Sequence, residues 1–175
     1  MAARVLVLVM LLIPRIAVAQ PSWEIAGGYS YLDDAPDRTN FPLGWFASGG
    51  IGVTQWLTAV GDVSRHARST LGIDLSTYAV LGGPRASARI GRVTEFGQVL
   101  VGVNHASSTV VGITSGDSGL AIQPGGGLDY PLSRRFAVRA QVDYRAIRGG
   151  VGPPIADPRH VLRGSAAIVY HGCCR

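Results

Sequence analysis

Residues 136–145 read F-A-V-R-A-Q-V-D-Y-R, and from Val138 onward apolar and polar side chains alternate. This period of two predicts an amphipathic β-strand. One face carries Phe136, Val138, Ala140, Val142 and Tyr144, and the other carries Arg139, Gln141, Asp143 and Arg145. Ten residues suit a tilted strand that crosses a membrane, which needs about 9 to 11, and exceed the roughly 5 to 6 usual in soluble sheets. The rest of the chain must show which solvent the apolar face meets.

The N-terminus predicts export from the cytoplasm. Met1 to Arg4 is short and basic, Val5 to Ile13 is an unbroken apolar run, and small residues precede Gln20. This order is typical of a cleavable signal peptide, with cleavage expected between Ala19 and Gln20. A retained anchor is the alternative, but nine apolar residues are too few to span a bilayer as a helix. We therefore expect residues 1–19 to be a signal peptide and residues 20–175 to form one domain.

Composition favours a membrane protein built from strands. The chain has 24 glycines and only 15% charged residues, yet after residue 19 no apolar run approaches 18 residues. This excludes helical membrane spans. A chain rich in apolar residues without long apolar runs is typical of strands that alternate between lipid and a polar interior.

The basic residues do not indicate a nucleic-acid partner. All sixteen are arginines, and they are scattered among eleven acidic residues instead of forming a patch. A nucleic-acid-binding surface is a concentrated basic face. We therefore expect no nucleic-acid partner for this exported chain.

Eight stretches have the pattern expected of strands, and an even number is usual for bacterial single-chain barrels. In the fourth stretch, the facing is left open because Thr77, Ala79 and Leu81 alternate with Tyr78 and Val80, so either face suits lipid. The predicted strands are residues 22–32, 44–53, 57–67, 75–84, 96–105, 119–129, 136–147 and 160–170.

The connections are expected to alternate between short and long. Residues 54–56 and 130–135 are short, whereas residues 33–43, 68–74, 106–118 and 148–159 are longer and polar. Short periplasmic turns and longer external loops distinguish outer-membrane barrels. Residues 85–95 are the exception, because they predict a longer periplasmic turn that contains Arg85, Arg89 and Arg92.

Three phrases resemble the small eight-stranded outer-membrane β-barrel proteins, such as the OmpA and OmpX transmembrane domains and the broad outer membrane protein β-barrel domain family. They are Y-A-V-L-G-G-P-R at 78–85, F-G-Q-V-L-V-G-V at 96–103 and G-G-G-L-D-Y-P-L-S-R-R-F-A-V-R at 125–139. The resemblance covers most of the chain after residue 19. It implies an antiparallel up-and-down transmembrane β-barrel in the outer membrane of a Gram-negative envelope, inserted by the barrel assembly machinery. The chain departs from the family at its end, because Tyr170 is followed by five further residues instead of closing the chain as a terminal aromatic residue.

Charged residues on the polar face are expected to point into the barrel and pair there. The interior of an eight-stranded barrel is just filled by side chains, and an unpaired buried charge is unfavourable. The predicted network consists of Glu24, Asp62, Arg139, Asp143 and Arg163. Aromatic side chains are expected to form girdles at the two membrane boundaries: Trp23, Tyr29, Tyr31, Trp45, Trp56, Tyr130, Tyr144 and Tyr170.

The predicted function is that of a structural or porin-like outer-membrane barrel with a side-chain-filled lumen. Its partners would be outer-membrane lipid and an extracellular molecule bound by the loops. One alternative is a narrow channel for small or hydrophobic solutes. Another is a soluble periplasmic lipocalin-like barrel, which requires the opposite polarity, with apolar side chains inside.

The sequence predicts no catalytic residue, cofactor or metal site. His66, His105, Ser64, Asp62 and Ser107 carry suitable groups for an enzyme, but no nucleophile motif such as G-x-S-x-G is present. Cys173 and Cys174 are adjacent, so a disulfide framework within one chain is excluded. With His171 they offer too few ligands for a typical zinc site. Asp33, Asp34 and Asp37 are interpreted as a solvated loop, with a cation or partner site as the alternative.

Overall fold

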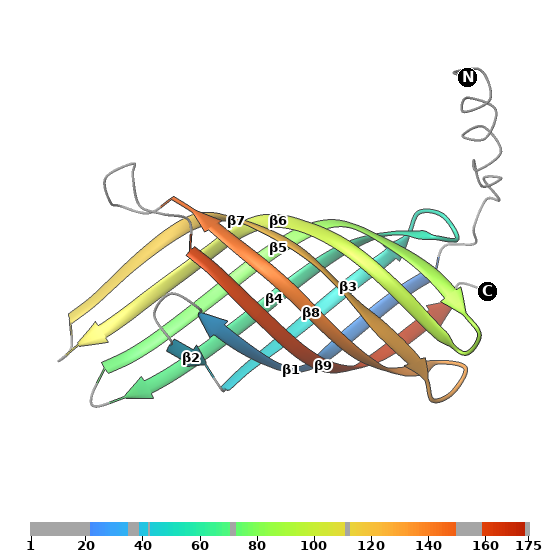
Figure 1. The fold of residues 1–175 in the computed structure, drawn as a ribbon, viewed down its shortest axis with the longest axis horizontal. Helices are drawn as coiled ribbons and strands as arrows, with labels where there is room; N and C mark the ends of the chain where they lie inside the picture. Colours follow the sequence, from blue (N-terminus) through green and yellow to red (C-terminus); the bar gives the residue numbers. More distant parts are fainter. Residues whose placement is uncertain are drawn as a thin grey trace, which may run out of the picture.

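The computed structural model describes residues 22–34, 39–41, 43–70, 73–110, 113–149 and 159–173 as a closed antiparallel barrel (Figure 1). Eight strands form the wall in chain order, and β1 pairs with β9 to close it. The prediction of an all-β, eight-stranded up-and-down barrel is therefore confirmed. The wall strands are β1(Ser22–Asp34), β3(Leu43–Gly52), β4(Leu57–Thr70), β5(Ile73–Ile90), β6(Val93–Val110), β7(Ile113–Pro131), β8(Phe136–Arg148) and β9(Arg159–Cys173), and the short β2(Thr39–Phe41) pairs with the end of β1.

Several sequence predictions lie outside the described residues. These are the signal peptide 1–19, its cleavage site at Ala19 and Gln20, Asp37 of the acidic loop, and Cys174. Cys173 is the last residue of β9. Within the described ranges, no helix is long and apolar enough to cross a membrane.

The register fixes the tilt of the strands. A row of paired residues that starts at His105 on β6 passes through Tyr78, Arg65 and Trp45 and around the remaining strands. It returns to β6 at Glu95, ten residues before His105. A stagger of this kind is required to close a sheet into a barrel, and it tilts the strands relative to the barrel axis.

One end of the barrel, called here the turn end, carries tight turns and the first and last described residues. Residues 53–56 and 132–135 connect neighbouring strands there, as predicted. The expected longer turn 85–95 is wrong, because β5 continues to Ile90 and β6 begins at Val93. Gly91 has a φ of 61°, a left-handed conformation that glycine adopts without strain. A two-residue turn therefore suffices.

At the opposite end, called here the loop end, four strands extend beyond the others. The pairing of β3 with β4 stops at Ala67, whereas β4 continues to Thr70. The pairing of β7 with β8 starts at Leu120, although β7 begins at Ile113. The expected loops 68–74 and 106–118 are thus mostly strand. Residues 68–70, 73–77, 106–110 and 113–119 form a projecting sheet, the loop-end ribbon (Figure 1).

The polarity of the wall is that of a membrane barrel. Along β8 exposed and buried side chains alternate, with Val142 56% exposed and Asp143 fully buried. On β5, Tyr78 and Val80 point outward while Ala79 and Leu81 are buried, which settles the facing of the fourth predicted strand. The soluble lipocalin-like alternative is wrong, because it needs an apolar interior and the structure places the charged side chains inside.

Candidate functional site in the barrel lumen

Between the two ends of the barrel, the described charged side chains that face the lumen are four arginines and four carboxylates. They come from six strands and are buried, except for the half-buried Glu24. Because the two signs are equal in number, the lumen has no net formal charge at neutral pH. The set is Glu24, Asp62, Arg85, Asp129, Arg139, Asp143, Arg145 and Arg163.

Four of these residues form the turn-end cluster. Arg139 on β8 donates from Nε to Oδ1 of Asp129 and from Nη2 to Oδ2, both at 2.7 Å. The same Nη2 donates to Oε1 of Glu24 at 3.0 Å, and Arg85 donates to that oxygen from across the barrel. Two-pronged pairing of this kind is the strongest geometry that a guanidinium makes with a carboxylate. The cluster ties β1, β5, β7 and β8 together.

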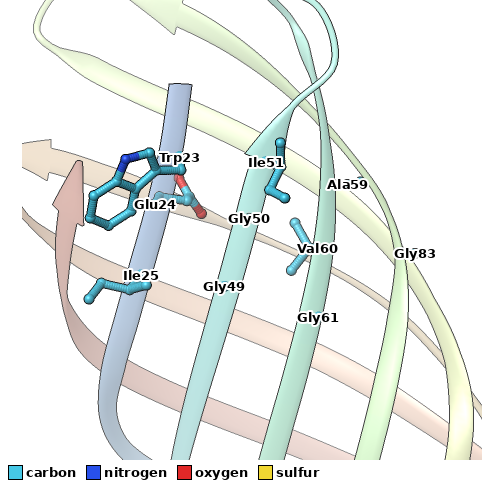
Figure 2. Close-up of a pocket in the computed structure, with 10 residues that line it drawn as sticks. All are labelled: Trp23, Glu24, Ile25, Gly49, Gly50, Ile51, Ala59, Val60, Gly61 and Gly83. Atoms are coloured by element: carbon cyan, nitrogen blue, oxygen red, sulfur yellow. The ribbon is translucent and has the colours of Figure 1, made fainter. Parts of the chain in front are cut away.

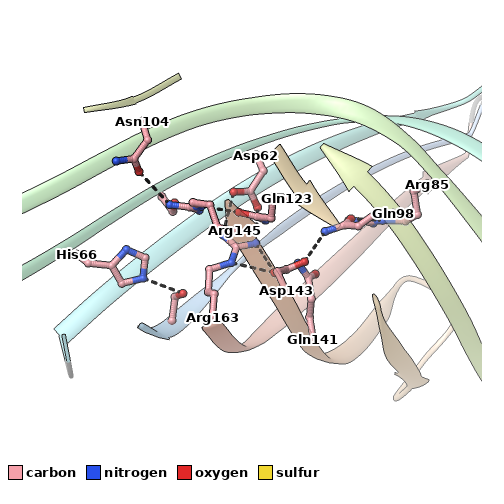
Figure 3. Close-up of polar contacts among 12 residues, drawn as sticks. Asp62, His66, Arg85, Gln98, Asn104, Gln123, Gln141, Asp143, Arg145 and Arg163 are labelled. Carbon is pink, nitrogen blue, oxygen red and sulfur yellow. Dashed lines mark hydrogen bonds and ion pairs between the residues drawn. The ribbon is translucent and has the colours of Figure 1, made fainter. Parts of the chain in front are cut away.

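Arg163 on β9 holds the central cluster. Its Nη1 and Nη2 donate to the two oxygens of Asp62 on β4, at 2.9 and 3.2 Å. Its Nε donates to Oδ2 of Asp143 on β8 at 2.9 Å. Gln141 also donates to Asp143 at 2.7 Å. Figure 3 shows Arg163, Asp143 and Gln141 converging in the lumen.

Arg145 differs from the other three arginines, because its described hydrogen-bond acceptors are all neutral. It donates to Gln123 at 2.7 Å, to Asn104 at 3.2 Å and to Ser64 at 3.1 Å (Figure 3). These acceptors stand on β7, β6 and β4. Only 1% of Arg145 is exposed. Arg145 comes two residues after Asp143 on β8, which runs toward the loop end, so it lies on the loop-end side of the central cluster.

Gln98 links the turn-end and central clusters, and the ring of Phe96 packs against two arginines of the turn-end cluster. Gln98 accepts from Arg85 at 2.9 and 3.0 Å and donates to Asp143 at 3.0 Å. The ring of Phe96 lies 4.5 Å from the guanidinium of Arg85 and 4.8 Å from that of Arg139. Cations at this distance are attracted to the ring face. The two clusters, Arg145 with its three acceptors, Gln98 and Phe96 thus fill the lumen, and together they are called here the plug.

The five residues of the predicted lumen network all lie in this plug, but not in one group. Arg139 contacts Glu24, whereas Arg163 contacts Asp62 and Asp143. Arg85 was missed because it was assigned to a turn. Asp129 and Arg145 have the inward-facing period of their strands, which is the signal that could have added them to the network.

The predicted girdle aromatics stand near the two ends of the barrel. At the turn end, the ring of Tyr170 lies 5.6 Å from that of Trp23 and 5.2 Å from that of Phe136. Trp56 and Tyr130 are also at this end. Towards the loop end, Tyr29 pairs with Trp45, Tyr31 lies further along β1, and Tyr144 stacks on His160 with its hydroxyl 2.6 Å from Nδ1. Phe136 and Tyr78 are exposed aromatic residues that the prediction left out.

The side chains considered for an enzyme are not brought together. Asp62, Ser64 and His66 are buried in the lumen, and His66 hydrogen-bonds to Ser30 at 3.0 Å. His105 is exposed on the outer face of β6, where it contacts Ser118 at 2.8 Å. The absence of a catalytic role stays a prediction.

One group of side chains offers ligand atoms close enough for a metal ion. Glu24, Asp129 and His171 each place one such atom within 4.8 Å of the others. Glu24 and His171 are paired across the β1–β9 seam. However, Arg139 already donates to both carboxylates. A cation would have to compete with a guanidinium there, so the group is better described as part of the turn-end cluster.

Two hollows of the described structure lie on its outer wall. One of about 520 Å³ is bordered by Trp23, Ile25 and Ile51 and floored by glycines of β3 and β4 (Figure 2). A second of about 660 Å³ adjoins it and shares Ile25, Gly49 and Gly61. Gly49 and Gly61 are outward-facing and paired, so small residues leave this part of the wall thin. Neither hollow is a passage through the lumen.

Comparison with solved structures identifies the architecture. The structure matches Neisserial surface protein A with a TM-score of 0.68 at 12% sequence identity, covering 89% of this chain and 98% of that one. It matches Ail, the attachment invasion locus protein of Yersinia pestis, with a TM-score of 0.60 at 19% identity, covering 88% and 100%. The fold is that of small outer-membrane β-barrels.

A third match agrees with this assignment. The N-terminal β-barrel domain of Pseudomonas aeruginosa OprF has a TM-score of 0.55 at 14% identity, covering 87% of this chain and 98% of that domain. At these identities the likeness concerns the fold. No family model and no curated protein matches the sequence. The outer-membrane barrel fold and the apolar outer wall together support the predicted location in the outer membrane.

Proposed function

We propose that the protein is an outer-membrane barrel with a closed lumen, and that the loop-end ribbon carries its recognition function. The observation behind the closed lumen is that Arg85, Arg145 and Arg163 reach partners on distant strands. An eight-stranded barrel has an interior just wide enough for side chains to fill. The plug leaves solute passage as the less favoured alternative.

The ribbon is the feature of the fold best suited to binding a partner. Residues 113–119 of β7 pair with β6 on one side, and within the described part of the chain no strand pairs with them on the other. Ser115, Gly116, Asp117 and Ser118 are exposed. An open strand edge offers backbone donors and acceptors to an extended peptide segment, which then adds a strand to the sheet.

The geometry of the membrane favours a foreign peptide over a second copy as the added strand. Two copies in one membrane are related by an axis along the membrane normal, so both β7 edges descend toward the membrane. They cannot pair antiparallel without one copy being inverted. An extended segment of another protein has no such restriction. Among the fold neighbours, Ail is described as an attachment protein and was solved with the heparin analogue sucrose octasulfate.

Shortening the ribbon tests this proposal. The variant replaces residues 107–116 with a two-residue turn, and a matched control shortens the β5–β6 hairpin at the turn end by deleting residues 88–95 and inserting the same turn. Cells that express each form are assayed for adhesion to cultured epithelial cells. We expect adhesion to be lost with the shortened ribbon and retained with the control. Equal adhesion by both variants, or no adhesion by the unaltered protein, would contradict the proposal.

A further inference from the structure

Three successive rows of paired residues on the outer face of β4, β5 and β6 change in chemistry toward the loop end. The first row is apolar: Val63 pairs with Val80, which pairs with Val103. The second row consists of Arg65, Tyr78 and His105, all of them exposed. In the third row Ser76 and Ser107 are paired, and their hydroxyl oxygens lie 2.8 Å apart. Over five residues of each strand toward the loop end, the outer face thus changes from apolar to cationic and then to hydroxyl-bearing side chains.

The same order occurs in a membrane lipid that has a phosphorylated headgroup. Acyl chains are followed by a phosphate and then by hydroxyl-rich groups that face water. We infer that Arg65, Tyr78, His105, Ser76 and Ser107, called here the headgroup patch, bind the phosphate headgroup of a lipid in the leaflet at the loop end. The inference rests on the proposed membrane location, since it requires Val80 and Val103 to face acyl chains.

The charge of the patch fits an anion. Arg65 is an exposed guanidinium that offers up to five N–H donors and matches phosphate in a two-pronged geometry. Trp45 and Tyr78 are its cross-strand neighbours, and aromatic residues of this kind favour the boundary between apolar and aqueous surroundings. Among the described outward side chains of β4, β5 and β6, the carboxylate is Glu95, which lies at the turn end. Asp74 of β5 stands one row beyond Ser76 and Ser107, where its backbone pairs with Ser69 and Thr109.

The guanidinium of Arg65 and the imidazole of His105 can lie at the same depth in the membrane although their Cα atoms lie at different depths. The row is inclined because the strands are tilted by about 35–45°, and neighbouring strands lie about 4.8 Å apart. The Cα atom of Arg65 is therefore roughly 6 Å nearer the membrane centre than that of His105. The long arginine side chain can extend upward to bring its charge to the boundary while its stem stays among apolar groups.

The histidine is held in place for this role. Its Nδ1 lies 2.8 Å from the hydroxyl of Ser118. Its ring lies against Gly116, where a Cβ atom would come within 3.1 Å of both Cε1 and Nε2. Both contacts come from β7, so the imidazole is held on the outer face over the β7 side of β6. The patch is thus partly preorganised.

The test uses the full protein in phosphatidylcholine nanodiscs, with phosphatidic acid added as the phosphate-bearing lipid. NMR of ¹⁵N-labelled arginine follows the Nε–H signal of Arg65 at neutral pH. We expect this signal to shift with the mole fraction of phosphatidic acid. In uniformly ¹⁵N-labelled samples the backbone amide of Tyr78 allows the variant to be compared with the unaltered protein, and we expect the mole fraction at half-saturation to be roughly fivefold higher in Arg65→Gln. Arg92→Gln is the matched control, because Arg92 is exposed in the turn at the opposite end.

The outcomes separate this inference from the proposed location. Heat-modifiable gel mobility and the circular dichroism of the nanodisc sample report whether the barrel is inserted. An inserted barrel that gives no phosphatidic-acid shift, or an equal response of Arg65→Gln and the unaltered protein, would overturn the inference while leaving the location intact. Equal weakening by Arg92→Gln would also overturn it. A shift produced equally by inorganic phosphate would contradict a lipid headgroup as the ligand.

Discussion

Arg145 on β8 donates from Nη2 to Oγ of Ser64 on β4 at 3.1 Å, across the full width of the barrel. In the closed ring of eight strands, β4 and β8 are four strands apart in either direction. One buried side chain therefore spans the lumen, and two further clusters lie between it and the turn end. The closure of the lumen is therefore redundant, since no single contact alone closes the barrel.

Arg145→Ala is expected to leave the lumen closed. The turn-end and central clusters do not depend on Arg145, so planar bilayers containing the variant should show no single-channel current. Stability should fall by about 1–3 kcal/mol, because Gln123, Asn104 and Ser64 each lose a hydrogen-bond partner. Urea unfolding in lipid vesicles measures the loss. Discrete current steps from this variant would show that Arg145 alone gates the lumen.

Arg163→Met is expected to destabilise the barrel more strongly. It removes the cation shared by Asp62 and Asp143, whose side chains are almost fully buried. Breaking a buried ion pair from one side costs about 3–5 kcal/mol. The comparison is with Arg92→Met, which changes an exposed turn residue and should have little effect. A similar midpoint of urea unfolding for the two variants would argue against the paired plug.

Val142→Arg tests whether the outer wall faces lipid. Val142 is 56% exposed and lies within the apolar band of β8. An arginine near the middle of the membrane costs about 2–4 kcal/mol in a barrel, but only about 0–1 kcal/mol near the boundary. Leu132→Arg, in the turn 132–135, is the boundary control. In a water-exposed wall both changes would be nearly neutral, so equal unfolding midpoints in vesicles would refute lipid contact at Val142.

Gly102→Ala should impair folding because of a close backbone approach. A Cβ atom at this position would lie 2.0 Å from the carbonyl oxygen of Val80. At Gly61 a Cβ atom would have no neighbour within 4 Å. Gly61→Ala should therefore be neutral or stabilise by about 0.4–1 kcal/mol. Folding yield, read from heat-modifiable mobility, compares the two. Equal yields would mean that β5 and β6 can separate enough to admit the methyl group.

The sequence predicts the barrel well wherever one face of a strand meets lipid. The pattern of residues 136–147 identifies β8 to within one residue, because one face of this strand carries apolar side chains toward lipid and the other carries polar side chains into the lumen. Beyond the membrane band both faces contact water, and alternation disappears. This is why residues 86–90 and 106–110 were assigned to connections although they continue β5 and β6.

The sequence predicted which charged residues face the lumen better than it predicted which of them pair. Alternation shows that Arg139, Asp143 and Arg163 share the inner face, but it carries no information about partners on distant strands. The contact of Arg163 with Asp62 depends on the stagger of the barrel, which brings together residues 101 positions apart. Arg85 could be assigned to the plug only once β5 was known to continue past Pro84.

Single-channel recording of the purified, unaltered protein in planar lipid bilayers tests the closed lumen most directly. Insertion is verified in parallel by heat-modifiable mobility of the protein recovered from the same lipid. Because charged pairs, amides and aromatic rings fill the lumen, we expect inserted protein to give no current above that of the lipid alone. A stable, stepwise current from inserted protein would contradict the closed barrel and favour the narrow channel.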